Sequence, residues 1–447
     1  MKIATLYKLY RQYFLVDTDT RNIRKNTLFF ALKGDNFNGN SFAEEALKRG
    51  ACFAIIDETA YQTKENIILV DNVLKTLQQL ANYHRKQLNI PVIGLTGSNG
   101  KTTTKELIHL VLSKKYNVKA TKGNLNNHIG VPLTLLSMTD KTELGIVEMG
   151  ANHQKEIEIL CSITEPDFGY ITNFGKAHLE GFGGIEGVIK GKSELYTFLK
   201  ENKKTVFVNI DDKIQVEKTK NIKSVCFNDE DLKFIEVNPF VKLHYKNTII
   251  KSNLIGKYNY TNIAAAITIG EYFKVPSHEM KEAIENYIPK NNRSQIIETI
   301  NNKIILDAYN ANPSSMIVAL ENFASIKAES KVVILGDMFE LGKDSLNEHQ
   351  AIIDLTTSLK FDKKLFVGEN FNLGKTNELQ FRSYQDLEEY LKKNPLKNQS
   401  ILIKGSRGMR LERILNVIRW FFSMFAVRCS MFNVRKTILI YKVAYHK

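Results

Sequence analysis

One short stretch, from Leu95 to Lys105 (LTGSNGKTTTK), constrains the fold of this chain more than any other. It follows an apolar run and precedes a segment whose apolar residues recur at three- and four-residue spacing, so it joins a buried strand to a helix. In such a turn, Gly97 and Gly100 let successive backbone N–H groups point inward around an anion, and the helix N-terminus adds partial positive charge. The stretch therefore predicts a cradle for a nucleotide triphosphate.

Two side chains complete this cradle. Lys101 supplies a full positive charge for the phosphates, and Thr102 can offer its hydroxyl to Mg²⁺. The predicted nucleotide-binding residues of the loop are Gly97, Ser98, Asn99, Gly100, Lys101, Thr102 and Thr103. A strict P-loop would have glycine where this chain has Leu95, so the first glycine is displaced by two positions. A Gly-Asn turn before an ordinary helix is the alternative interpretation.

The variant T-G-x-N-G-K-T-T resembles the Mur ligase family of bacterial cell-wall synthesis, and further motifs resemble the same family in the same order. They are D-T-R, L-F-F-A-L-K-G, G-N-L-N-N-x-I-G-V-P-L-T-L-L, D-x-Y-N-A-N-P-x-S-M and G-D-M-x-E-L-G. The last two are the most discriminating, and they resemble the family member that adds D-alanyl-D-alanine. The resemblance covers residues 17–418.

Length and the alternation of strand-like and helical patterns predict an α/β protein with three domains. At 447 residues the chain is too long for one ordinary core. We expect a small N-terminal α/β domain, a central P-loop ATPase domain with a mostly parallel sheet, a C-terminal Rossmann-like domain, and an atypical basic and apolar tail: residues 1–86, 87–292, 293–418 and 419–447. The resemblance implies that the N-terminal domain binds a uridine nucleotide and that the C-terminal domain binds the incoming dipeptide. No G-x-G-x-x-G follows the first strand of the third domain, so a dinucleotide cofactor is not expected.

Composition narrows the class of protein. Four cysteines without paired spacing indicate neither a disulfide framework nor a zinc site. The absence of a secretion signal and of a transmembrane segment predicts a cytoplasmic protein. The net charge is +14, but six Lys or Arg and no acidic residue fall in the tail, so no nucleic-acid partner is expected. The tail could rest on an anionic membrane surface or be a poorly ordered extension, and we expect a monomer.

Two polar segments of the N-terminal domain, residues 19–21 and 33–39, are typical of a surface loop and a turn. The resemblance implies that they approach the uracil, ribose or diphosphate of a UDP-activated substrate. The residues concerned are Thr20, Arg21, Lys33, Asn38 and Gly39.

The resemblance also implies substrate contacts in the other two domains. Asn126 and Asn127 would contact the muramyl peptide, although a run of asparagines can simply form Asx turns. Asn310, Asn312 and Ser314 would face D-alanyl-D-alanine, with helix capping by Asn312 or Ser314 as the competing explanation. For the nucleotide, Asn262 would contact the adenine, and Arg293 and Asp307 would approach the ATP. Asn259 alternatively caps the helix that carries Asn262.

Four residues are predicted as metal ligands: Thr102, Glu148, His178 and Lys192. Glu148 ends a strand-like run beside the phosphate loop, where a Mg²⁺ ligand belongs, and a solvated glutamate is the alternative. The resemblance makes His178 a ligand of a second Mg²⁺. By residue type Lys192 is a solvated lysine, whereas the resemblance implies a CO₂-derived carbamate that would serve as an oxygen ligand. Such a carbamate needs a lysine with a depressed pKa, because only the neutral amine attacks CO₂.

The resemblance implies ATP-dependent amide formation, with Lys101, His178 and Lys192 as catalytic residues. The terminal carboxylate of a UDP-N-acetylmuramoyl-tripeptide attacks the γ-phosphate of ATP, and the amine of D-alanyl-D-alanine attacks the resulting acyl phosphate. Lys101, Mg²⁺ and the loop amides would offset the repulsion between carboxylate and triphosphate. Two alternatives stay open: another amide ligase of the superfamily, such as a folylpolyglutamate synthase, or a P-loop protein that acts as a switch or nucleic-acid motor.

Overall fold

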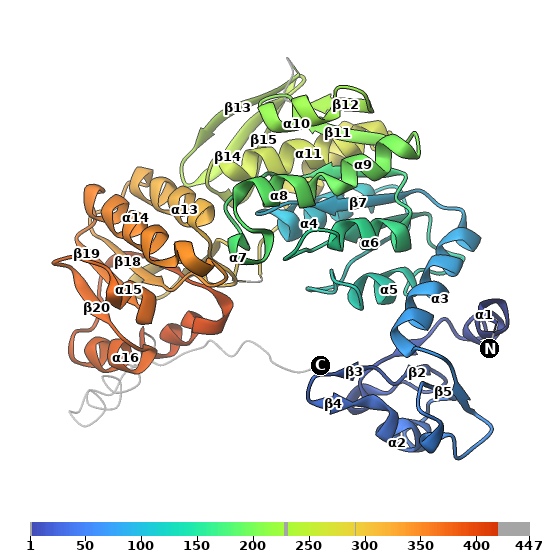
Figure 1. Cartoon of the computed structure of the whole chain (residues 1–447). Coiled ribbons are helices and arrows are strands. Elements are labelled where there is room, and N and C mark those ends of the chain that lie inside the picture. The colour runs from blue at the N-terminus through green and yellow to red at the C-terminus, as the bar shows by residue number, and fades with distance from the viewer. Residues whose placement is uncertain (1, 228–230, 291, 419–447) are drawn as a thin grey trace, which may run out of the picture. The chain divides into compact units, whose positions relative to one another are not determined.

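The computed structural model describes residues 2–227, 231–290 and 292–418 (Figure 1). The described chain forms two compact units. The first contains residues 2–227, 231–290, 312–326 and 338–348, and the second contains residues 292–311, 327–337 and 349–418. Both units combine helices with mostly parallel sheets, as the sequence predicts.

The N-terminal part of the first unit is built on a four-stranded parallel sheet with the order β1-β2-β5-β6. Its elements are α1 (Ile3–Tyr10), β1 (Val16–Asp17), β2 (Leu28–Phe30), the hairpin β3 (Lys33–Gly34) and β4 (Phe37–Asn38), α2 (Ala43–Lys48), β5 (Phe53–Ile56), β6 (Ile67–Leu69) and α3 (Val73–Leu88), with 3₁₀ turns at Thr20–Asn22, Gly39–Phe42 and Thr59–Tyr61. All three residues of β2 are buried, and an apolar cluster that includes Phe29, Ala46 and Ile56 forms the core between the sheet and α2.

The central part of the first unit is a six-stranded, entirely parallel sheet with the order β12-β11-β10-β7-β9-β8. Its strands are β7 (Val92–Thr96), β8 (Val118–Ala120), β9 (Leu144–Glu148), β10 (Phe168–Ile171), β11 (Thr205–Asn209) and β12 (Lys223–Phe227). Its helices are α4 (Lys101–Leu112), α5 (Gly130–Leu135), α6 (Glu156–Thr164), α7 (Leu179–Phe182), α8 (Ile185–Lys192), α9 (Glu194–Glu201), α10 (Lys213–Thr219), α11 (Tyr258–Tyr272) and α12 (Ser277–Glu285). An antiparallel sheet follows β12 in the chain, with strands β13 (Leu232–Val237), β14 (Phe240–Tyr245) and β15 (Thr248–Ile255).

Helix packing explains why α4 is held firmly behind the phosphate loop. Its apolar face, including Ile108 and Val111, is fully buried, and α4 packs against α11. On α11, Ala264, Ala265 and Ala266 are also fully buried. Gly270 on the same helix faces Val111 of α4, where a Cβ would overlap the Val111 side chain, so the two helix backbones approach closely at this point.

The second unit contains a six-stranded sheet with the order β16-β17-β21-β18-β19-β20, in which only β16 is antiparallel to its neighbour. Its strands are β16 (Gln295–Glu298), β17 (Asn302–Asp307), β18 (Lys331–Gly336), β19 (Lys363–Val367), β20 (Leu379–Phe381) and β21 (Gln399–Lys404). The helices in and around this part of the chain are α13 (Pro313–Ser325), α14 (Ser345–Ser358), α15 (Glu369–Leu373) and α16 (Tyr384–Lys393). The sheet carries its own apolar core, which includes Ile304, Ile334 and Ile403.

Two local sequence patterns differ from the structure in part. Residues 122–132, rich in asparagine and interrupted by Pro132, indicate a loop; residues 122–129 do form turns and irregular backbone, but α5 begins at Gly130 and includes Pro132. Proline fits in the first turn of a helix because its missing N–H needs no partner there. Residues 409–418 carry a helical pattern, but the 3₁₀ turns Arg407–Met409 and Leu411–Arg413 interrupt its first half, whereas residues 414–418 are helical.

The predicted tail, residues 419–447, lies outside the described residues. Among the described residues, no helix is both long enough and apolar enough to cross a membrane. The domain boundaries expected from the sequence stay predictions.

Candidate active site

The phosphate loop connects the end of β7 at Thr96 to the start of α4 at Lys101. Gly97 and Gly100 have φ values of +138° and +80°, a region that L side chains rarely adopt. A Cβ at Gly97 would overlap the side chain of Thr172, so this glycine also permits a close approach. No described side chain caps the first turn of α4, which is the arrangement expected of a helix end that takes an anion.

The side chain of Lys101 folds back over this loop. Its Nζ donates to the carbonyl oxygen of Gly97 at 2.6 Å and to that of Ser98 at 3.1 Å. The ammonium group is therefore already at the loop, where it can exchange these carbonyl oxygens for phosphate oxygens. The geometry agrees with the predicted cradle, and phosphate binding by the loop stays a prediction.

Glu148 lies at the end of β9, directly beside β7, and is 1% exposed. The hydroxyl of Thr102 donates to its Oε2 at 3.2 Å, and Asn126 Nδ2 donates to its Oε1 at 2.9 Å. Lys105 Nζ lies 3.7 Å from Oε2. Glu148 is thus not a solvated glutamate, and the structure brings it together with Thr102, a second predicted metal ligand.

The donors at Glu148 fit Mg²⁺. A carboxylate and a hydroxyl are hard oxygen ligands, and Mg²⁺ is commonly held by one or two such groups together with water and substrate phosphates. Among the described residues, no group of three or more His, Cys, Asp or Glu gathers to form a complete protein cage.

Lys192 is 1% exposed at the end of α8, so the interpretation as a solvated lysine is wrong. Its Nζ donates to the carbonyl oxygen of Ala151 at 2.9 Å and lies 5.0 Å from the ring centre of Phe182. Burial lowers the pKa of Lys192 well below its usual value, and the positive charge of Lys101 lowers it further. A lysine in this environment can supply the neutral amine that carbamate formation needs.

His178 is placed differently from the other predicted metal ligands. It precedes α7 with a φ of +54°, and its ring Nδ1 contacts a carboxylate oxygen of Glu340 within the first unit. This contact lowers the pKa of Glu340, which belongs to the G-D-M-x-E-L-G motif. Nδ1 of His178 could bind a metal ion only if it first released Glu340.

Asn312 and Ser314 lie near the phosphate loop within the first unit. Asn312 Nδ2 donates to Asn99 Oδ1 at 2.7 Å, and Ser314 Oγ accepts from the backbone N–H of Lys176 at 2.8 Å. Asn312 also caps α13 in a capping box with Ser315. The capping explanation is therefore confirmed for Asn312, in addition to its contact with the loop.

Arg293, Asp307 and Asn310 gather at one edge of the sheet in the second unit. Asp307 ends β17, and its Oδ2 accepts from Lys404 Nζ at 2.6 Å at the end of the neighbouring parallel strand β21. Lys404 Nζ also donates to the carbonyl oxygen of Asn310 at 3.3 Å. The guanidinium of Arg293 lies 3.8 Å from the ring centre of Tyr309. Ligands of open α/β sheets bind at such carboxyl ends of strands.

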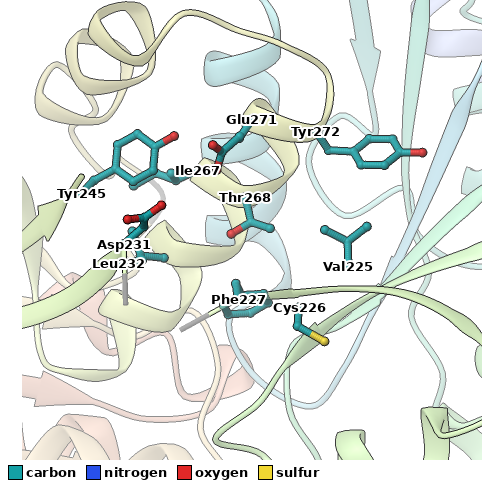
Figure 2. Close-up of a pocket in the computed structure, with 10 residues that line it drawn as sticks. All are labelled: Val225, Cys226, Phe227, Asp231, Leu232, Tyr245, Ile267, Thr268, Glu271 and Tyr272. Carbon is teal, nitrogen blue, oxygen red and sulfur yellow. The ribbon is translucent and has the colours of Figure 1, made fainter. Parts of the chain in front are cut away.

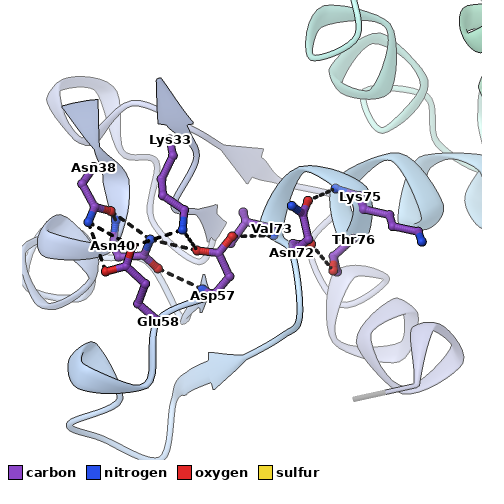
Figure 3. Close-up of polar contacts among 9 residues, drawn as sticks. All are labelled: Lys33, Asn38, Asn40, Asp57, Glu58, Asn72, Val73, Lys75 and Thr76. Atoms are coloured by element: carbon purple, nitrogen blue, oxygen red, sulfur yellow. Dashed lines mark hydrogen bonds and ion pairs between the residues drawn. The ribbon is translucent and has the colours of Figure 1, made fainter. Parts of the chain in front are cut away.

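In the N-terminal part, Lys33 and Asn38 belong to a connected polar network (Figure 3). Lys33 Nζ lies 2.9 Å from Asp57 Oδ1 and 3.1 Å from Glu58 Oε1. Asn38 Nδ2 donates to Glu58, and its Oδ1 accepts from Asn40. The network holds both predicted substrate residues in defined positions on the β3–β4 hairpin.

The other predicted residues of this part are held by local contacts. The guanidinium of Arg21 forms a two-pronged contact with Asp19, which lowers the pKa of that carboxyl to about 2, and the Arg21 side chain is exposed. Thr20 lies in the same 3₁₀ turn. Gly39 is buried, and a Cβ there would overlap the carbonyl oxygen of Leu32.

Comparisons with known proteins decide the family. Three family models match successive parts of the chain: the Mur ligase family, catalytic domain (residues 13–85), the Mur ligase middle domain (95–270) and the Mur ligase, glutamate ligase domain (292–407). The UDP-N-acetylmuramoyl-tripeptide--D-alanyl-D-alanine ligase of Bacillus subtilis is 36% identical over 420 residues, which cover 90% of this chain and 92% of the relative. The chain belongs to the Mur ligase family.

Further relatives and solved structures support the same family. The enzyme with the same name from Escherichia coli is 31% identical, with 90% of this chain and 93% of the relative covered. The crystal structure of MurF ligase from Thermotoga maritima in complex with ADP matches with a TM-score of 0.81 at 26% identity, over 93% of this chain and 99% of that one. A MurF structure from Acinetobacter baumannii matches with a TM-score of 0.80 at 28% identity, over 90% and 92% of the two chains. The predicted family and fold class are confirmed.

Two predicted ligand contacts of this Mur ligase are already occupied by protein partners. Both polar atoms of Asn262 are engaged, since its Oδ1 accepts from Thr104 and its Nδ2 donates to Asn259. Asn259 lies inside α11 and does not cap it, so that alternative is wrong. Asn127 Oδ1 accepts from the backbone N–H groups of Ile129 and Gly130 at the start of α5, as an Asx turn would. Ligand roles for Asn262 and Asn127 stay predictions.

Three residues at the loop were not predicted as site residues. Thr172 and Asn173 follow β10, and both donate to the carbonyl oxygen of Asn99. Lys105 contacts Glu148. The sequence did show that Thr172 and Asn173 are polar residues at the carboxyl end of a strand, where ligands often bind. It did not show that this strand, β10, lies next to β7, and only the tertiary structure reveals that pairing.

A pocket of about 180 Å³ lies elsewhere in the first unit of this Mur ligase (Figure 2). Residues of β12, β14 and the second half of α11 contribute to its lining, among them Phe227, Tyr245 and Glu271. Asn262, which contacts the loop helix, lies in the first half of α11. The pocket is therefore separate from the candidate active site.

Proposed function

We propose that this Mur ligase joins a UDP-N-acetylmuramoyl-tripeptide to D-alanyl-D-alanine at the expense of ATP, in the synthesis of peptidoglycan precursors. The observation that carries the proposal is the pairing of the Lys101 phosphate loop with the buried Thr102–Glu148 contact at neighbouring strand ends. The names of the relatives from Bacillus subtilis and Escherichia coli support the choice of the two substrates.

In the first step, a carboxylate oxygen of the tripeptide attacks the γ-phosphorus of ATP, and the bond to the bridging oxygen of ADP breaks. Lys101 and the N–H groups at the start of α4 would bind the phosphate oxygens and stabilise the charge that develops there. Thr102 and Glu148 would hold Mg²⁺, which when bound neutralises part of the triphosphate charge. These groups offset the repulsion between two anionic reactants.

In the second step, the amine nitrogen of D-alanyl-D-alanine attacks the carbonyl carbon of the acyl phosphate, inorganic phosphate leaves, and the amine loses a proton. We propose that Asn310, Asn312 and Ser314 bind the dipeptide and that Arg293 and Asp307 approach the nucleotide. The strand-end position of Asp307 supports its role, and the contact of Asn312 with Asn99 of the phosphate loop supports the role of Asn312 beyond its capping of α13. The UDP group would be bound by residues of the N-terminal part: Thr20, Arg21, Lys33, Asn38 and Gly39. Asn126, which contacts Glu148, would approach the muramyl peptide.

We also propose that Lys192 carries a carbamate and, with His178, serves a second Mg²⁺. The buried position of Lys192 and its lowered pKa support this role, because a neutral amine attacks CO₂. Incubation with isotope-labelled CO₂ followed by trapping and mass spectrometry should label the peptide that contains Lys192. A Lys192→Met variant should lose the label and the ligase activity, and an unlabelled wild-type peptide would contradict the carbamate.

The ligase reaction is tested by measuring phosphate release with each substrate omitted in turn. We expect release only when ATP, the UDP-muramyl tripeptide and D-alanyl-D-alanine are all present, with one amide product per phosphate. Full hydrolysis without the muramyl peptide would instead indicate a nucleotide switch or motor. Replacement of D-alanyl-D-alanine by glutamate would indicate a folylpolyglutamate synthase-like ligase. The cytoplasmic location and the monomeric state stay predictions.

A further inference from the structure

We propose that Lys105 is the resident counter-ion of Glu148. It balances the buried carboxylate when no divalent cation is bound, and its charge opposes cation binding until a nucleotide supplies phosphate charge. Lys105 is thus a positioning residue that makes metal binding depend on the nucleotide. The inference rests on the proposed function, because it takes Glu148 as a metal ligand.

Burial is the first observation. The side chains of Lys105 and Glu148 are 4% and 2% exposed, and Lys105 Nζ lies 3.7 Å from Glu148 Oε2. A buried ammonium or carboxylate is costly unless an opposite charge accompanies it. The other side-chain contacts of Glu148 come from Thr102 and Asn126, which are neutral. Among the described side chains that contact Glu148, Lys105 therefore provides the positive charge.

The second observation is the division of roles along α4. Lys101 and Lys105 are four residues apart in one helix, so their side chains leave the same face. Lys101 reaches back to the carbonyl groups of Gly97 and Ser98, whereas Lys105 reaches the carboxylate at the end of β9. Lys101 thus lies where the phosphates would bind, and Lys105 lies beside the proposed metal ligand Glu148.

Charge balance gives the functional consequence. Lys101, Lys105 and Glu148 together carry one net positive charge, so a divalent cation that arrives alone meets repulsion. A triphosphate reverses the sign of the site, and the cation then binds favourably. Charges a few ångströms apart in a buried site are poorly screened by salt, so one lysine can exert this control.

The test is binding of Mn²⁺ alone to the full chain, measured by titration calorimetry and electron paramagnetic resonance without nucleotide. In Lys105→Met the side chain keeps its length but loses its charge. We expect Mn²⁺ to bind this variant about tenfold or more tightly than the wild type. In EDTA the variant should have a lower Tm than the wild type, and Mn²⁺ should restore it. The matched control is Lys119→Met, an exposed lysine on β8, which should leave both measurements unchanged.

Two further variants separate a charge effect from a packing effect. Lys105→Arg retains the charge and should bind Mn²⁺ as weakly as the wild type. The double variant Lys105→Met with Glu148→Gln removes both charges, so it should lose the added Mn²⁺ affinity and recover a higher Tm in EDTA than Lys105→Met alone. If Lys105→Met does not fold in EDTA, recovery of its structure on addition of Mn²⁺ becomes the expected result.

Unchanged or weaker Mn²⁺ affinity in Lys105→Met, with only a lower Tm, would overturn the inference and leave Lys105 a purely structural residue. This failure is distinct from failure of the proposed function. The latter would appear in the wild type, as an absence of metal-dependent nucleotide binding and of amide formation.

Discussion

At the scale of single residues, contacts within the protein hold the phosphate loop in place. Lys101 lies over the carbonyl groups of Gly97 and Ser98, and Thr172 buttresses the loop through the carbonyl oxygen of Asn99. A charge that is held in place needs little reorganisation when phosphate charge develops beside it. We therefore expect Lys101 to contribute more to the rate of the chemical step than to the stability of the fold.

Replacement of Lys101 by methionine should lower kcat/KM for amide formation by about a hundredfold or more, because a preorganised charge at the reacting phosphate is lost. Steady-state kinetics with all three substrates measures this effect. Circular dichroism should show an intact fold, and Lys119→Met on β8 provides a matched lysine control. Unimpaired amide synthesis by Lys101→Met would mean that the loop does not hold the reacting phosphate.

At the scale of elements, helix α3 links the four-stranded and the six-stranded parallel sheets of the first unit. Its first backbone N–H, at Val73, donates to Asp57 Oδ2 in the polar network of Figure 3. Its last turns carry Arg85, which forms an ion pair with Asp167 at 2.6 Å, and the fully buried His84. The helix is thus anchored at both ends by polar contacts as well as by packing.

Asp57 should matter for the UDP-activated substrate, because it holds Lys33 and Asn40 and receives the first N–H of α3. Asp57→Ala should raise KM for that substrate about tenfold and leave KM for ATP unchanged. Initial-rate kinetics with each substrate varied in turn measures both constants. Glu65→Gln, an exposed acidic residue in the same part of the chain, is the control. An equal rise in both KM values would argue against a local role.

His84 should make stability depend on pH. Its Nε2 lies 3.0 Å from the carbonyl oxygen of Met138 and its Nδ1 lies 3.2 Å from the hydroxyl of Tyr7, and burial lowers its pKa from 6.5 to about 4. The unfolded chain therefore binds more protons than the folded chain between these values. The contribution of His84 to stability should be fully present above pH 6.5 and should be lost, by about 3 kcal/mol, as the pH drops to about 4.

Urea unfolding of the wild type and of His84→Gln, compared between pH 7.5 and pH 5, measures this contribution. Glutamine retains a donor and an acceptor but does not titrate, so its free energy of unfolding should depend less steeply on pH over this interval. Equal pH dependence in the two proteins would show that His84 does not contribute.

At the scale of the whole molecule, each ligand should protect its own part of the chain. A ligand present at a hundred times its Kd stabilises the folded state by about 2.7 kcal/mol, which slows exchange that proceeds through local opening by up to about a hundredfold. With Mg²⁺ and a non-hydrolysable ATP analogue, hydrogen exchange should slow in residues 96–104 and near Glu148 and Asp307. The UDP-activated substrate should instead slow exchange in the β3–β4 hairpin. Protection by the nucleotide confined to the hairpin would contradict the assignment of the sites.

The spacing of Gly97, Gly100 and Lys101 between an apolar run and a helical pattern was sufficient to predict the loop, because these residues interact within one turn. The alternation of strands and helices likewise predicted parallel sheets. Periodicity did not locate the interruption at 407–413, where short 3₁₀ turns replace a regular helix. Local pattern is reliable only where local interactions decide the conformation.

The sequence by itself determined the phosphate loop, the α/β class and the family resemblance, since these depend on neighbouring residues and on motif order. Only the tertiary structure decided that Lys192 and Glu148 are buried, that Asn127 is used by α5, and that Lys105 meets Glu148. Burial and charge pairing arise between segments that are distant in the chain. No property of a lysine or glutamate in sequence reveals which strand end or helix face will lie opposite it.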